Sequence, residues 1–157
     1  MFEILKSIFV PSGDEKAAET EFSTDDLRLA EAALMFHVIQ SDGSIIEVEL
    51  QRMKKILTSE YGLSEEQMNA LIEAARAAEN EAVDLYRFTS LLKRSLDRKH
   101  LVQIVENLWE MVYADGVVHE LEDNVVWRIA ELLDIGSHER MKMKRRVRAR
   151  RTAKSKT

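Results

Sequence analysis

Hydrophobic side chains recur every three to four residues along most of the chain, which is the spacing of one face of an α-helix. In the first long segment Leu27, Ala30, Leu34 and Val38 keep this spacing through about residue 40. The pattern predicts an all-α fold, a compact bundle of about seven helices with short connections. The main helices are expected over residues 24–40, 47–60, 64–78, 84–96, 99–113 and 120–133, and from 137 onward.

Local signals mark where these helices begin and end. Ser64 and Gln67 have the spacing of a capping box, in which each side chain bonds the backbone N–H of the other residue. Gly62 can adopt the left-handed conformation that often ends a helix, here the helix of residues 47–60. Three other residues are expected to cap helix N-termini: Thr24, Asp84 and Ser137.

The clearest feature of the sequence is an internal repeat. When the chain is aligned with itself, Leu34–Leu57 falls on Asn107–Ala130, and four of the five identities cluster at the turn in the middle of each copy. Each copy reads as a helix, an Asp-Gly turn and a second helix, so the pattern predicts two helical hairpins related by a pseudo-twofold axis. The identical pairs are Asp42/Asp115, Gly43/Gly116, Glu47/Glu120, Glu49/Glu122 and Ile56/Ile129.

At these two turns the chain resembles the TerB family of tellurite-resistance proteins. The resemblance rests on residues 41–49 and 114–122, each with Asp-Gly, an apolar residue two positions later and Glu seven positions after the Asp, and it spans roughly residues 24–140. It implies an all-helical fold, acidic residues that bind a divalent metal, and a role in stress or tellurite resistance. A related fold precedes the J-domain of some co-chaperones, but this chain has no J-domain and no chaperone role is carried over.

The acidic residues of the two turns allow two interpretations. Asp in an Asp-Gly turn bonds its own backbone, and a Glu near the third position of a helix completes a cap, so the motif can be wholly structural. Alternatively Asp42, Glu49, Asp115 and Glu122 converge on a cation, for which oxygen ligands favour Ca²⁺ or Mg²⁺. Because each loop is too short for an EF-hand, such a site needs ligands from both copies.

The rest of the sequence favours a binding module over an enzyme. The chain has no cysteine, no glycine-rich phosphate loop, no nucleophile motif and no HExxH motif. His37 and His119 are expected to be hydrogen-bonded or exposed and not metal ligands. The leading hypothesis is a cytoplasmic stress-related module with an unidentified protein partner. The alternatives are a metal-free scaffold for protein–protein interaction and, third, a metal-dependent hydrolase.

Charge divides the chain into an acidic body and a basic tail. Residues 142–157 hold nine Lys and Arg and no acid, which leaves 28 acids against 14 bases in the rest of the chain. The tail is expected to be disordered, with a contact to anionic lipid or nucleic acid, or a latch on the acidic body, as alternatives. The expected division is a short helix and linker over 1–23, the helical domain over 24–141 and the tail, with no membrane-spanning segment.

Overall fold

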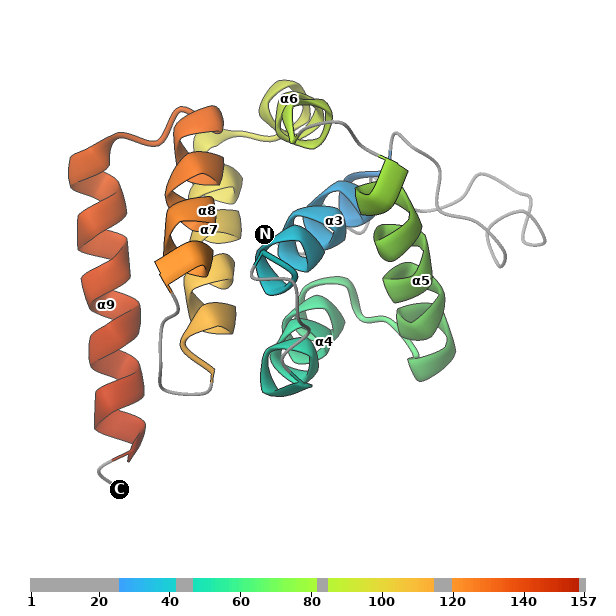
Figure 1. The fold of residues 1–157 in the computed structure, drawn as a ribbon, viewed down its shortest axis with the longest axis horizontal. Coiled ribbons are helices and arrows are strands. Elements are labelled where there is room, and N and C mark those ends of the chain that lie inside the picture. Colours follow the sequence, from blue (N-terminus) through green and yellow to red (C-terminus); the bar gives the residue numbers. More distant parts are fainter. Residues whose placement is uncertain (1–25, 42–46, 82–84, 115–119, 156–157) are drawn as a thin grey trace.

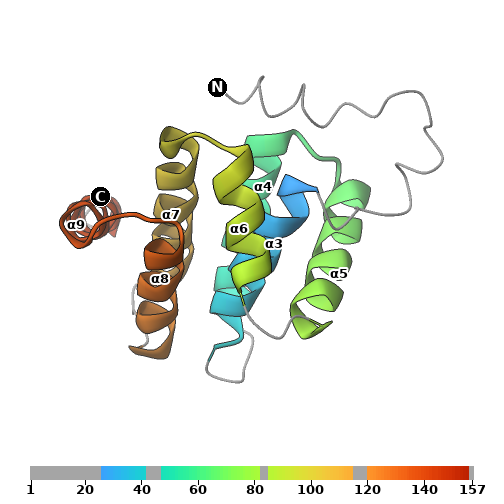
Figure 2. The ribbon, with the colours of Figure 1, turned by 90° about the horizontal axis from the view of Figure 1, so that it is seen from above.

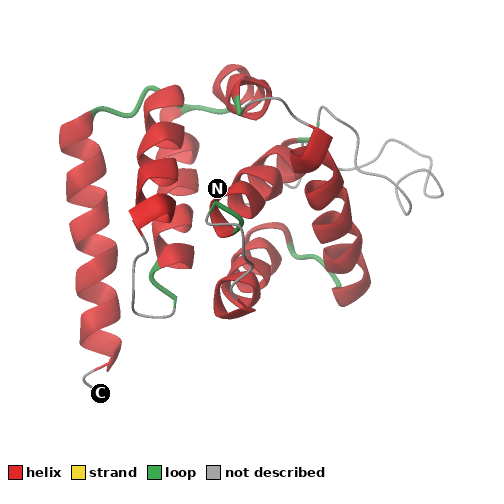
Figure 3. Ribbon diagram, in the orientation of Figure 1, coloured by secondary structure: helices red, strands yellow, loops and turns green. Residues whose placement is uncertain are grey.

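The computed structural model describes residues 26–41, 47–81, 85–114 and 120–155, with side chains described except for those of residues 81 and 151–155. All regular structure in these ranges is helical, which confirms the all-α prediction (Figure 3). The segment 1–23 and the proposed cap Thr24 lie outside the described residues, as does Asp84. The helices are α3 (Leu27–Ile39), α4 (Glu47–Tyr61), α5 (Glu65–Glu81), α6 (Tyr86–Ser95), α7 (Arg98–Val112), α8 (Glu120–Leu132) and α9 (Ser137–Ser155).

Helix α3 is the centre of the bundle. It packs against α4, α5, α6, α7 and α8, and only Arg28 and His37 among its residues are not buried. Helices α5 and α9 lie at opposite ends of the molecule in both ribbon views (Figures 1 and 2). A helix that is apolar on nearly all sides requires neighbours all around it, and α3 has them.

The two predicted hairpins pack across one another. Helix α4 contacts α7 as well as α3, and α8 contacts α3 as well as α7, so the second helix of each hairpin covers the first helix of the other. In the self-alignment of the sequence, α3 and α4 fall on α7 and α8, with only small offsets at the helix ends. This reciprocal packing of the two hairpins is the arrangement expected of a twofold repeat. A common origin of the two halves stays a prediction.

The predicted helix ends at residues 62–67 are confirmed. Gly62 follows α4 with a φ of 63°, in the left-handed region. The backbone N–H of Ser64 donates to Gln67 Oε1 at 2.9 Å, and that of Gln67 donates to Ser64 Oγ at 3.1 Å, which completes the capping box. The N-cap of α3 is Asp26, whose Oδ1 accepts from the N–H of Arg28 at 2.9 Å.

The prediction of a disordered basic tail is wrong for residues 142–155, which continue α9 from Ser137. The predicted domain boundary between residues 141 and 142 falls inside this helix. The side chains of Met143 and Val147, one turn apart, are fully buried against the bundle. Two apolar anchors suffice to dock a helix whose other positions are charged, because the stems of long cations also cover apolar surface.

Ion pairs add to this docking. Lys144 Nζ donates to Asp123 Oδ1 of α8 at 2.6 Å, and Arg150 Nη2 donates to Glu106 Oε1 of α7 at 2.7 Å. The basic segment therefore forms the latch on the acidic body that was the third interpretation of its charge. Within the described ranges, no helix is both long enough and apolar enough to cross a membrane.

Candidate functional site

The two Asp-Gly turns follow helices that end in the same way. The backbone N–H of Gln40, which closes α3, donates to the carbonyl oxygens four and two residues earlier. Tyr113 closes α7 with the same pair of bonds. The turns themselves, residues 42–46 and 115–119, lie outside the described residues, but the chain enters both from the same geometry.

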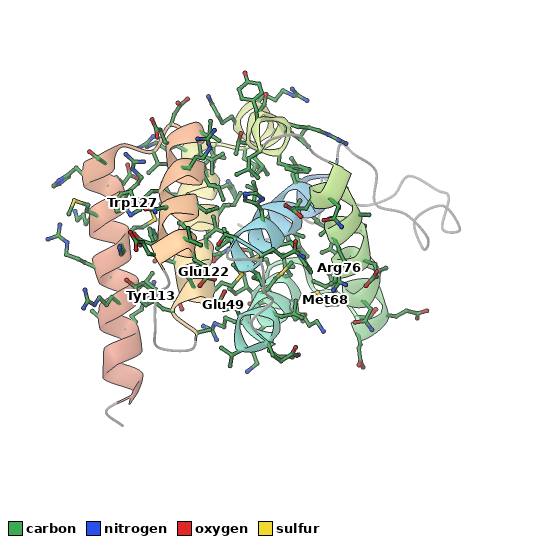
Figure 4. The ribbon with its side chains drawn as sticks, viewed as in Figure 1. Glu49, Met68, Arg76, Tyr113, Glu122 and Trp127 are labelled. Carbon is green, nitrogen blue, oxygen red and sulfur yellow. The ribbon has the colours of Figure 1, made fainter. Side chains whose placement is uncertain are left out.

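The helices that follow the turns each bury one acid in their first turn. Glu49 is the third residue of α4 and Glu122 the third residue of α8, and both side chains are 0 % exposed. Glu47 and Glu120, the first residue of each helix, are exposed. Both buried glutamates carry labels in Figure 4, where they lie in the interior of the bundle and not on its rim. Each repeat therefore directs one carboxylate inward.

The structure thus places two of the four acids predicted to bind a metal, Glu49 and Glu122, in the interior. Asp42 and Asp115 lie outside the described residues, so whether the four carboxylates meet stays a prediction. Among the residues that are described, no group of three or more His, Asp and Glu side chains is arranged to hold a metal ion. A site in this region therefore requires oxygens from the turns in addition to Glu49 and Glu122.

Burial of these two glutamates is costly in a way that exposed helix-capping acids are not. A carboxylate removed from water loses several kcal/mol of solvation unless hydrogen bonds or a positive charge replace it. The first turn of a helix supplies part of that compensation through its N–H groups and dipole. A hard divalent cation would add to it, and the all-oxygen donor set fits Ca²⁺ or Mg²⁺.

A second group of buried acids was not predicted. Glu31 of α3 and Glu60 of α4 are 2 % and 5 % exposed and lie next to one another in the core. The hydroxyl of Tyr61 donates to Glu31 Oε1 at 3.4 Å, and the amide of Asn107 on α7 donates to Glu60 Oε1. The network therefore links three helices through polar groups inside an apolar bundle.

Burial raises the pKa of both glutamates, and that of Glu31 most strongly, because each is removed from water and Glu31 also faces the charge of Glu60. The hydrogen bond from Asn107 favours the charged form of Glu60 and opposes the rise in its pKa. Desolvation and the neighbouring acids likewise raise the pKa of Tyr61. The pair is best described as a neutral, protonated Glu31 whose hydroxyl donates a hydrogen bond to the Glu60 carboxylate.

The sequence offered one signal for this pair. Glu31 is the single acidic residue in α3, a helix whose other residues are mostly apolar. Glu60, by contrast, precedes the predicted helix end at Gly62 and reads as an ordinary surface acid. Only the packing of α3 against α4 brings the two together, and the sequence pattern does not contain that information.

His37 follows the expectation that it is hydrogen-bonded or exposed, whereas the partner of His100 was not predicted. His37 Nδ1 lies 2.9 Å from Glu79 Oε1 of α5, and His100 Nδ1 lies 2.5 Å from Asp97 Oδ1. The backbone N–H of His100 also donates to Asp97, and this bond lowers the pKa of Asp97. His138 is exposed, and His119 lies outside the described residues.

Comparison with known proteins agrees with the all-helical fold and the predicted family. The family model described as tellurite resistance protein TerB matches residues 28–145, which is most of the chain and extends from α3 into α9. No similar protein was found among the curated proteins, and no similar chain among the solved structures. The match covers both hairpins and all the helices between them, and on this ground the chain belongs to the TerB family.

Proposed function

We propose that this chain is a TerB-type binding module that acts without catalysis in a stress response related to tellurite resistance. A divalent cation, Ca²⁺ or Mg²⁺, would be held by Asp42 and Glu49 of the first repeat and by Asp115 and Glu122 of the second. Occupation of the site would fix the two turns against each other. The surface around the turns would then bind a protein partner. The absence of cysteine fits a reducing compartment such as the cytoplasm.

The observation that supports the metal is the complete burial of Glu49 and Glu122 at equivalent positions. An acid that only favours a helix N-terminus can stay at the surface, as Glu47 and Glu120 do in the same two helix turns. Two inward carboxylates from different repeats instead suggest a shared positive charge. The competing function is a metal-free scaffold, in which the same glutamates serve only as internal caps of α4 and α8.

Substitution of glutamate by glutamine separates these two functions. Glutamine fills the capping-box position as well as glutamate does, but it lacks the charge that a hard cation requires. We therefore expect Glu49→Gln and Glu122→Gln to leave the metal-free protein folded and to weaken binding of Ca²⁺ or Mg²⁺. For the unsubstituted chain, a cation at about 100 times its Kd adds about 2.7 kcal/mol, which raises the Tm by roughly 5–10 °C.

The measurement is a thermal melt and a calorimetric titration with each cation, on protein first treated with a chelator. The matched controls are Glu47→Gln and Glu120→Gln, which remove exposed acids from the same helix turns and should bind the cation as the original chain does. If neither Ca²⁺ nor Mg²⁺ changes the Tm of the unsubstituted chain, the metal proposal fails and the scaffold function is favoured.

A further inference from the structure

A pocket of about 410 Å³ lies between α4, α7 and the C-terminal part of α9, and it is open to solvent. These three helices come from different parts of the chain (Figure 1). Along α4 the lining residues run from Arg52 to Glu60 on one helix face, and α7 supplies the facing wall. We call this feature the α4–α7 pocket. None of its lining residues belongs to the proposed cation site.

One end of the α4–α7 pocket is positively charged. Arg52, Lys55 and Arg150 line it, together with one acid, Glu110. The guanidinium groups of Arg52 and Arg150 lie 3.3 and 3.1 Å from the two oxygens of Glu110, which holds both in place. The side chains of Arg52 and Arg150 are 28 % and 52 % exposed, so this end of the pocket offers guanidinium N–H groups to an acceptor.

The opposite end carries acceptor groups on a rigid support. Glu60 lies here with Ser59 and Asn107. The amide of Gln103 donates to Asn107 Oδ1 at 2.9 Å, and the amide of Asn107 donates in turn to Glu60 Oε1. This chain of bonds fixes the direction of the Glu60 carboxyl before any ligand arrives, which reduces the ordering cost of binding.

The acid at this end is not required by the fold. When the alignment of the two repeats is extended in the same register, Glu31 and Glu60 correspond to Ile104 and Leu133, which are 3 % and 1 % exposed. The second half of the molecule therefore fills the same two positions with apolar side chains. A buried acid is commonly less stabilising than an apolar residue of similar volume, so the retention of Glu60 at a position that lines the pocket points to a role in binding.

We propose that the α4–α7 pocket binds a small zwitterion, with its anionic group at Arg52 and Arg150 and its amino group at Glu60. The rise from Arg52 to Glu60 is about 12 Å along a helix axis. Side chains reaching inward shorten that span, so the ligand's two charges are separated by several bonds. This geometry fits ω-amino acids and short peptides and excludes the compact charge pair of glycine. The volume is in the range of small-molecule sites.

The proposal is tested with a homologous series of ω-amino acids from glycine to 6-aminohexanoate, titrated by calorimetry into the full chain at concentrations up to about 10 mM. Hexanoate and hexylamine, which each carry one of the two charges, are the comparison ligands. Affinity is expected to rise along the series and to fall at least about 10-fold when either charged group is absent, which corresponds to about 1.4 kcal/mol.

Two substitutions locate the bound charges. Glu60→Gln retains an acceptor for Asn107 and should weaken 6-aminohexanoate about 10-fold while leaving hexanoate unchanged. Arg52→Gln should weaken both ligands. Lys55→Gln, at an exposed position of the same end, gives the same test if Arg52→Gln does not fold. Arg128→Gln and Glu73→Gln change exposed charges outside the pocket and should bind as the original chain does.

Each possible outcome of these titrations either supports or overturns the proposal. Binding of 6-aminohexanoate that is lost in the pocket variants and retained in the controls supports the proposal. Equal affinity for hexanoate and 6-aminohexanoate overturns recognition of the amino group. Absence of binding by every member of the series overturns the proposal as a whole. None of these results depends on a divalent cation, because the titrations are performed in the presence of a chelator.

Discussion

The two halves of the molecule have the same arrangement of three helices but different chemistry in the third. α5 directly follows α4 in the chain and packs against α3 and α4, as α9 directly follows α8 and packs against α7 and α8. The resemblance extends to single contacts. Phe36 is covered by the guanidinium of Arg76 at 5.3 Å, and the equivalent Trp109 is covered by the ammonium of Lys144 at 5.1 Å.

The difference lies in how each third helix is held. α5 buries a continuous apolar face that includes Met68, Leu71 and Ile72, whereas α9 buries only Met143 and Val147 among its described apolar side chains. α9 compensates with ion pairs to α7 and α8. Apolar burial does not depend on salt, and partly exposed ion pairs do. One architecture is therefore stabilised by two kinds of interaction that respond differently to conditions.

The largest expected effect is on the apolar helix. Leu71 is fully buried, and Leu71→Ala should lower the free energy of unfolding by about 2–5 kcal/mol. Val147→Ala on α9 removes less volume and should cost about 1.5 kcal/mol. Urea denaturation measures both, with Glu73→Ala on the exposed face of α5 as the control. Equal losses for the two core substitutions would show that α9 is as firmly integrated as α5.

A smaller effect distinguishes the two cations over the equivalent aromatic rings. Lys144 contacts the rings of Trp109 and Trp127 and pairs with Asp123 at 2.6 Å. Lys144→Met should therefore cost about 1–2 kcal/mol at low salt and less at high salt.

Arg76 provides the matched comparison, because it forms no ion pair within the described part of the chain. Arg76→Met should cost about 0.5–1 kcal/mol, with little dependence on salt. Thermal melts at two NaCl concentrations measure both variants. The same salt dependence in the two would contradict the assignment of ionic docking to α9 alone.

An effect of similar size but opposite sign is expected at the buried acid pair. Glu31→Gln retains an acceptor for Tyr61 and can donate an N–H to Glu60 without a bound proton. At pH 7 the variant should be more stable by about 1 kcal/mol, or roughly 2–4 °C in Tm, because residue 31 no longer has to take up a proton when the chain folds. The matched control is Glu131→Gln, on the exposed side of α8.

The buried acid pair also predicts in which direction the stability of the folded chain changes with pH. Burial raises the pKa of Glu31 and of Glu60, so above the ordinary value of 4.5 the folded chain holds protons that the unfolded chain has released. Stability from this pair is complete below pH 4.5 and falls as the pH rises toward the folded-state pKa values. Glu31→Gln should flatten that fall in melts between about pH 4 and 8. An unchanged slope would mean that Glu31 takes no part in it.

Much of the fold follows from local sequence, and the site follows only in part. Helical periodicity and the signals at Gly62 and Ser64 predict elements correctly because those interactions are short in range. The continuation of α9 through residues 142–155 was missed because its few apolar residues are separated by cations, a pattern that also describes disordered tails. The Glu31–Glu60 pair was missed because it depends on how α3 and α4 pack.

The packing of each hairpin's second helix on the first helix of the other hairpin has a consequence for synthesis of the chain. α3 is among the first of the described segments to leave the ribosome, yet one of the helices that covers it, α8, follows only after α4, α5, α6 and α7. Until then part of its apolar surface has no native neighbour. The nascent first half therefore exposes apolar surface of the kind that chaperones bind, and the contacts of α3 are completed only after α8 has been made.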